Sequence, residues 1–93
     1  MEISKMLTIS TGHITKETAN LLENDSIREI VVYSKGDYGY FVHVPDEFDY
    51  LVSKNEIPED LCKCIELALK NKIDWICLDR DGEIIPELEE YEW

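Results

Sequence analysis

The pattern of hydrophobic positions predicts five short strands. Runs rich in β-branched and aromatic residues cover residues 5–11, 30–33, 40–44, 75–79 and 83–85. Turn residues at 34–37 separate the second strand from the third, and turn residues at 80–82 separate the fourth from the fifth, so each pair is expected to form a hairpin.

Two segments instead have hydrophobic residues at helical spacing. The first helix is expected to begin after Thr15, which is a suitable N-cap, and to end near Glu23. The second should begin at Pro58, a residue favoured at the first helical position, and end near Asn71. Residues 46–57 read as a polar connection that holds one short helical turn.

The order β-α-β-β-α-β-β predicts an α+β fold, in which two helices pack on one face of a mainly antiparallel sheet. A chain of 93 residues is expected to form a single compact domain over residues 1–93. Its hydrophobic content of 44% is too high for a disordered acidic tail, despite a net charge of −12.

The composition also indicates where the protein is located and which classes of partner it does not bind. The sequence has no apolar run long enough to form a transmembrane helix. Its first residues lack the basic-then-apolar order of a signal peptide, so a cytoplasmic protein is expected. With 21 acidic against 9 basic residues, the chain should repel phosphates. Direct binding to nucleic acid or to an anionic membrane is therefore not expected.

The cysteines and histidines, which could in principle act in catalysis or bind a metal, do not form a catalytic or metal-binding motif. Cys62, Cys64 and Cys77 are an odd number without paired metal-ligand spacing, and they are interpreted as reduced core residues. His43 lacks a recognisable nucleophile or acid partner in the sequence. We predict no enzyme activity, no metal and no cofactor.

One junction supports an alternative hypothesis. Gly12, His13 and Thr15 lie where the first strand leads into the first helix, and helix N-termini attract anions. A small-molecule or nucleotide-binding protein would use this junction. A single glycine is weak evidence for a phosphate site, and ordinary turn and capping chemistry also explains these residues.

The charge distribution is the most informative feature. Residues 45–60 carry a net charge of −5 and residues 79–93 a net charge of −6. These two stretches therefore account for nearly all of the negative net charge of the chain. Aromatic residues are interspersed among these acids, as expected of a surface that binds a basic groove. A solvated surface that only keeps the protein soluble would explain the same charges. The candidate partner-binding residues are Asp46, Glu47, Phe48, Asp49, Tyr50, Glu87, Glu89, Glu90, Tyr91 and Trp93.

Four blocks of sequence resemble a known family. They are residues 9–15 with Thr18 and Leu21–Leu22, residues 39–42, residues 57–61 and residues 78–82. The chain is similar to a family of small uncharacterised acidic bacterial proteins, a domain of unknown function often carried on phages and other mobile elements. This resemblance implies no active-site residue. It implies a context in which small acidic proteins frequently inhibit host defence proteins.

The favoured hypothesis is accordingly a non-catalytic inhibitor of the anti-restriction or anti-CRISPR type. It would mimic DNA and occupy a basic, nucleic-acid-binding surface of a host protein. An antitoxin-like regulatory subunit would use the same acidic surface, and the sequence does not separate the two.

Overall fold

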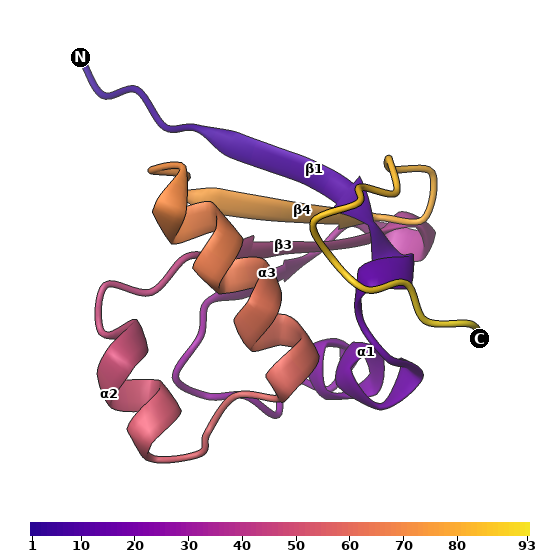
Figure 1. The fold of residues 1–93 in the computed structure, drawn as a ribbon, viewed down its shortest axis with the longest axis horizontal. Helices are drawn as coiled ribbons and strands as arrows, with labels where there is room; N and C mark the ends of the chain where they lie inside the picture. The colour runs from indigo at the N-terminus through magenta and orange to yellow at the C-terminus, as the bar shows by residue number, and fades with distance from the viewer.

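The computed structural model describes all 93 residues and contains a four-stranded mixed sheet (Figure 1). The strands are β1 (Met6–Ser10), β2 (Val32–Ser34), β3 (Gly39–His43) and β4 (Trp75–Asp79). Their spatial order is β1-β4-β3-β2. β1 runs parallel to β4, whereas the β4–β3 and β3–β2 pairs are antiparallel. The prediction of a mainly antiparallel sheet is confirmed.

The helices lie on one side of this sheet (Figure 1). They are α1 (Lys16–Glu23), α2 (Phe48–Ser53) and α3 (Glu59–Lys70), and two 3₁₀ turns, η1 (Thr11–His13) and η2 (Gly36–Tyr38), connect elements. Both predicted helices are present within a residue of their expected bounds. The expected short helical turn in the connection after β3 is a helix of six residues, α2.

The core lies between α3 and the inner face of the sheet. Leu61 and Ile65 of α3 are fully buried, as are Ile9 of β1 and Ile76 and Leu78 of β4. Burying an aliphatic side chain of this size stabilises a fold by about 1.5–3 kcal/mol relative to leaving it in water. These contacts hold α3 against the sheet, and the position of α3 in turn sets one wall of the site described below.

The three cysteines, Cys62, Cys64 and Cys77, are free and buried, as predicted. Burial raises the pKa of Cys64 to about 12, and the nearby Asp60 carboxylate adds to the shift. Only the thiolate is a strong nucleophile, so this thiol is inert near neutral pH.

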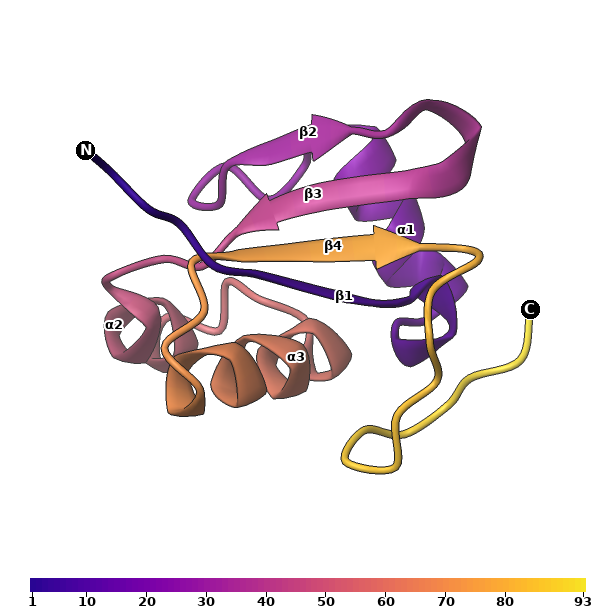
Figure 2. The ribbon, with the colours of Figure 1, turned by 90° about the horizontal axis from the view of Figure 1, so that it is seen from above.

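The predicted fifth strand at residues 83–85 is wrong. The Glu83 carbonyl accepts a hydrogen bond from the Ser10 amide at 2.9 Å, but no strand ladder follows. The Ile85 amide donates instead to the ring of His13, and the next residue, Pro86, has no amide hydrogen to donate. Residues 80–93, called the C-terminal segment below, therefore leave the sheet and pass over η1 (Figure 2).

Glycine is required where the C-terminal segment crosses β1. A Cβ atom on Gly82 would lie only 2.5 Å from the carbonyl carbon of Ile9. Any larger residue would push the C-terminal segment away from the strand. The same constraint applies at Gly39, where φ is +148° and a Cβ would collide with the Leu78 carbonyl.

The other face of the sheet carries no helix (Figure 2). Alternation along the strands places Tyr33, Phe41, His43 and Trp75 on this face, opposite to the core residues. These four side chains are called the aromatic face. At one end of it the Lys35 ammonium donates a hydrogen bond to Asp79, forming the single ion pair of the structure.

The Lys35–Asp79 pair predicts an acid-dependent contribution to stability. The hydrogen bond from Lys35, aided by the Asp81 amide, holds the pKa of Asp79 below the ordinary aspartate value of 3.8. A lowered carboxyl pKa contributes stability that is complete above the ordinary value and is lost as the pH falls through the lowered one. Lys35→Met should move the Asp79 midpoint upward in an NMR titration of side-chain carboxyl carbons. It should also reduce the loss of unfolding free energy on acidification below pH 3.8. An unchanged midpoint would contradict this assignment.

Candidate functional site: an acidic groove

His13 attaches the C-terminal segment to the domain. Its side chain is 1% exposed. The ring Nδ1–H donates to the Glu89 carbonyl at 2.9 Å, and Nε2 accepts from the Ile85 amide at 3.0 Å. Because one nitrogen must donate and the other must accept, the ring is the neutral Nδ1–H tautomer. Both ring nitrogens serve the fold, and neither is free for a ligand.

Two more hydrogen bonds hold the end of the C-terminal segment over η1. The Tyr91 amide donates to the Gly12 carbonyl at 2.7 Å, and the Trp93 indole Nε1–H donates to the Ile14 carbonyl at 2.9 Å. The backbone of the junction at residues 12–14 is therefore covered by the protein's own chain.

Asp60, in the first turn of α3, occupies the N-terminal end of α1. Its Oδ2 accepts from the Thr15 amide at 2.7 Å, and its Oδ1 accepts from the Thr18 hydroxyl at 2.8 Å. Thr15 also caps α1, as predicted, by accepting from the Thr18 amide at 3.2 Å. The helix N-terminus favours an anion, and the protein supplies that anion from α3. The alternative hypothesis of a ligand at Gly12, His13 and Thr15 gains no support from this arrangement.

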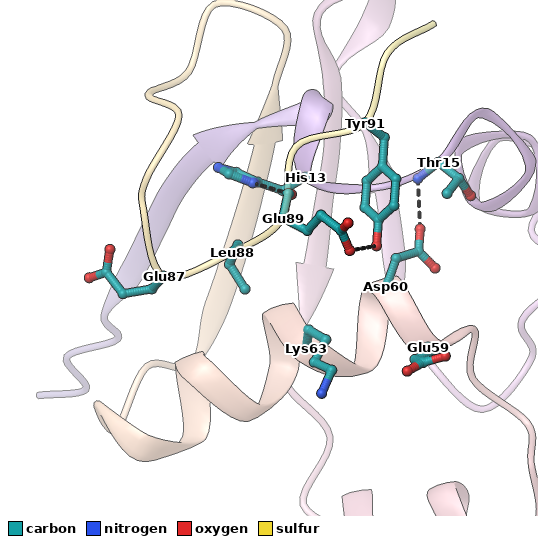
Figure 3. A pocket seen from close by; sticks show the side chains of 9 residues that line it. All are labelled: His13, Thr15, Glu59, Asp60, Lys63, Glu87, Leu88, Glu89 and Tyr91. Carbon is teal, nitrogen blue, oxygen red and sulfur yellow. Dashed lines mark hydrogen bonds between the residues drawn. The ribbon is translucent and has the colours of Figure 1, made fainter.

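A groove of about 520 Å³ lies between α3 and the C-terminal segment (Figure 3). Glu59, Asp60 and Lys63 line it from α3, and Glu87 and Glu89 line it from the C-terminal segment. The remaining lining residues are His13, Thr15, Leu88 and Tyr91. These nine residues are called the acidic groove.

The acidic groove carries four carboxylates and one lysine, and none of these charges forms an ion pair. The hydroxyl of Tyr91 donates to Oε2 of Glu89 at 3.3 Å. Burial raises the pKa of Tyr91, and the carboxylates of Glu89, Asp60 and Glu59 raise it further. Burial alone would raise this pKa, and the contribution of the three carboxylates has the same sign because negative neighbours disfavour the phenolate.

The structure does not bring the ten predicted partner-binding residues together at one site, because three of them line the acidic groove beside the C-terminal segment and three line a hollow beside α2. The helix α2 and the C-terminal segment lie on either side of α3 (Figure 1). Glu87, Glu89 and Tyr91 line the acidic groove. Asp46, Glu47 and Tyr50 line a second hollow of about 410 Å³ beside α2, together with Glu29 and His43. Asp49, Glu90 and Trp93 are exposed but line neither hollow of this pair.

The prediction that Phe48 is an exposed partner-binding residue is wrong. Phe48 is 7% exposed and belongs to the core, so its ring is not available as an anchor. As the first residue of α2, it holds that helix against the domain. Glu59 and Asp60, in contrast, were not among the candidates, although their acidic stretch was recognised. Their contact with residues 87–91 depends on tertiary packing that the local pattern does not encode.

No three His, Cys, Asp or Glu side chains converge in a geometry that could hold a metal ion. No helix combines the length and the apolar character needed to cross a membrane.

The fold and the acidic groove thus define a small acidic α+β domain with a surface hollow of net negative charge. Residues 6–93 match the C-terminal domain of a family of unknown function, DUF5983, and the chain belongs to this family. No curated protein and no solved structure matches the chain.

Proposed function

We propose that this protein binds a basic surface of another protein through the acidic groove and blocks that surface. One observation carries the proposal. Two acidic stretches that are distant in sequence meet across a single hollow, where four carboxylates face one lysine and none of them forms an ion pair. Such unpaired charges repel one another and cost stability, which a positively charged partner would relieve.

The size of the acidic groove indicates what enters it. A volume of about 520 Å³ accommodates a few side chains rather than a folded element. Lysine and arginine fit its chemistry, since carboxylates accept their hydrogen bonds and the Tyr91 ring can lie against their stems or charged groups. The exposed acids around the groove would attract such a partner from a distance.

The partner class that we favour is a nucleic-acid-binding protein. Its phosphate-binding surface is the kind of basic surface that a carboxylate-lined protein can occupy in place of DNA or RNA. In this account the protein is a non-catalytic inhibitor, and occupation of the surface is its whole action. An antitoxin-like subunit would bind in the same way but to a partner without affinity for nucleic acid.

The test is affinity capture from a bacterial lysate with three immobilised baits. They are the wild type, the groove variant Glu87→Lys/Glu89→Lys, and the control Glu2→Lys/Asp37→Lys, which changes the net charge equally at exposed positions away from the groove. A genuine partner is retained by the wild type and the control at low salt, and not by the groove variant. Adding duplex DNA or single-stranded RNA should then release the partner, because the nucleic acid and the bait compete for the same basic surface of the partner.

Two results would contradict the proposal. Equal retention by all three baits would show that the acidic groove does not bind the partner. Retention that depends on the groove but resists every nucleic-acid competitor would exclude mimicry and favour the antitoxin-like alternative.

A further inference from the structure

The aromatic face is an unpartnered surface on the side of the sheet opposite to the helices (Figure 2). Tyr33 is 59% exposed, and Phe41, His43 and Trp75 are each partly exposed. A sheet face is usually covered by another layer, because its alternate side chains are apolar. Here the apolar positions are mainly aromatic, and no part of the chain packs over them as a layer.

Three of the four rings of the aromatic face are in contact with one another through Trp75. Trp75 on β4 reaches across β3 to Tyr33 on β2, with 5.9 Å between ring centroids. His43 meets the Trp75 ring edge-on at 4.8 Å. Contacts of this kind fix the ring orientations, so the exposed surfaces of Tyr33 and Trp75 are already arranged for a ligand.

The protein's own cations indicate which ligand these rings accept. Lys35 lies 5.7 Å from the centroid of Phe41, on the aromatic face itself. Elsewhere, Lys54 lies over Tyr50 at 5.5 Å and Arg80 over Tyr38 at 4.7 Å. Three of the nine basic residues thus rest on surface rings. Tyr33 and Trp75 have no such cation.

The hollow that adjoins the aromatic face at His43 is negatively charged. His43 also lines the hollow beside α2, where Glu29, Asp46 and Glu47 supply three carboxylates and no lysine or arginine is present. A ligand that places one cationic side chain on Trp75 or Tyr33 can therefore reach these carboxylates with a neighbouring one. Cation–π contact combined with carboxylates favours arginine, whose planar guanidinium both stacks and forms paired hydrogen bonds.

We propose that the aromatic face is a docking surface for an arginine- or lysine-rich segment of a partner protein, with Tyr33 and Trp75 as cation acceptors. A second copy of this chain is a poorer occupant, because two molecules of net charge −12 repel each other. Single-stranded nucleic acid also stacks on aromatic sheets, but it requires a positive surround that this molecule lacks. The inference shares with the proposed function only the positive charge of the partner.

The test is an NMR titration of the full chain with an oligo-arginine peptide, with an oligo-glutamine peptide of equal length as the uncharged comparison. The indole N–H signal of Trp75 reports binding, because Trp75 lies on the aromatic face. The indole N–H signal of Trp93 is the internal control, because this group already donates to the Ile14 carbonyl. Oligo-arginine should shift the Trp75 signal and leave that of Trp93 nearly unmoved, and oligo-glutamine should shift neither.

A variant pair tests the role of the ring. Tyr33→Leu should weaken binding measured at Trp75 by about three- to five-fold, as expected for one exposed cation–π contact. Tyr38→Leu should leave it unchanged, since Tyr38 is similarly exposed but lies elsewhere and already carries Arg80.

The outcomes separate this inference from the proposed function. Shifts at Glu89 and Tyr91 without a shift at Trp75 would overturn the inference and leave the acidic groove supported. Shifts at Trp75 alone would support the inference and count against the groove. A single-stranded oligonucleotide that shifts Trp75, or a dimer in sedimentation experiments that Tyr33→Lys dissociates, would also overturn the inference.

Discussion

Replacing His13 by alanine is expected to lower the free energy of unfolding by about 3 kcal/mol. The variant loses two hydrogen bonds, leaves the Ile85 amide and the Glu89 carbonyl without a partner, and opens a cavity under the C-terminal segment. Denaturant unfolding followed by tryptophan fluorescence measures the change. A loss below about 0.5 kcal/mol, the usual range of surface substitutions, would contradict this structural role.

Proteolysis shows whether the loss is local to the C-terminal segment. A glutamate-specific protease should cleave the His13→Ala variant after Glu83, Glu87 or Glu89 faster than it cleaves the wild type. His13→Asn is the graded comparison, because its amide can still donate to the Glu89 carbonyl although it cannot replace both ring contacts. It should fall between the wild type and the alanine variant in both measurements.

Reversing the charge of Glu87 and Glu89 together is expected to weaken partner binding by about 100-fold at low salt. Each reversal replaces an attraction with a repulsion in a partly enclosed hollow, and close charge pairs at interfaces are worth about 1.5 kcal/mol or more. Isothermal titration calorimetry with the captured partner measures the loss. Both glutamates are exposed and form no ion pair, so the Glu87→Lys/Glu89→Lys variant should remain folded.

The control variant Glu2→Lys/Asp37→Lys distinguishes local from global electrostatics. It changes the net charge by the same amount, and a partner held by the acidic groove should lose only a few-fold of affinity through weaker long-range attraction. Equal losses for the two variants would indicate that overall charge, rather than the acidic groove, attracts the partner.

Local patterns were sufficient to predict most of the fold. Thr15 as a cap, Pro58 at the start of α3 and the β-rich runs of β1, β3 and β4 each act through neighbours within a few residues, so the sequence displays them. Residues 83–85 do not form a strand because the Ile85 amide donates to the His13 ring, 72 residues away in sequence, instead of to a neighbouring strand. No rule of periodicity reveals such a contact.

The candidate site was predictable only in its chemistry. The count of charged residues located both acidic stretches. It did not predict which residues of the two stretches would come together in the fold. Packing of α3 on the sheet and attachment of the C-terminal segment to His13 bring Glu59 and Asp60 to Glu87 and Glu89. The same packing places Asp46 and Glu47 in the separate hollow beside α2 and buries Phe48.

The most direct test of the account is the salt dependence of partner binding, compared between the wild type and the Glu87→Lys/Glu89→Lys variant. If carboxylates of the acidic groove stand in for phosphates, the logarithm of the wild-type association constant should fall linearly with the logarithm of salt concentration. The groove variant should show a clearly shallower slope, because fewer charge contacts remain to be screened. Parallel slopes, or a wild-type affinity that does not change with salt, would contradict the account.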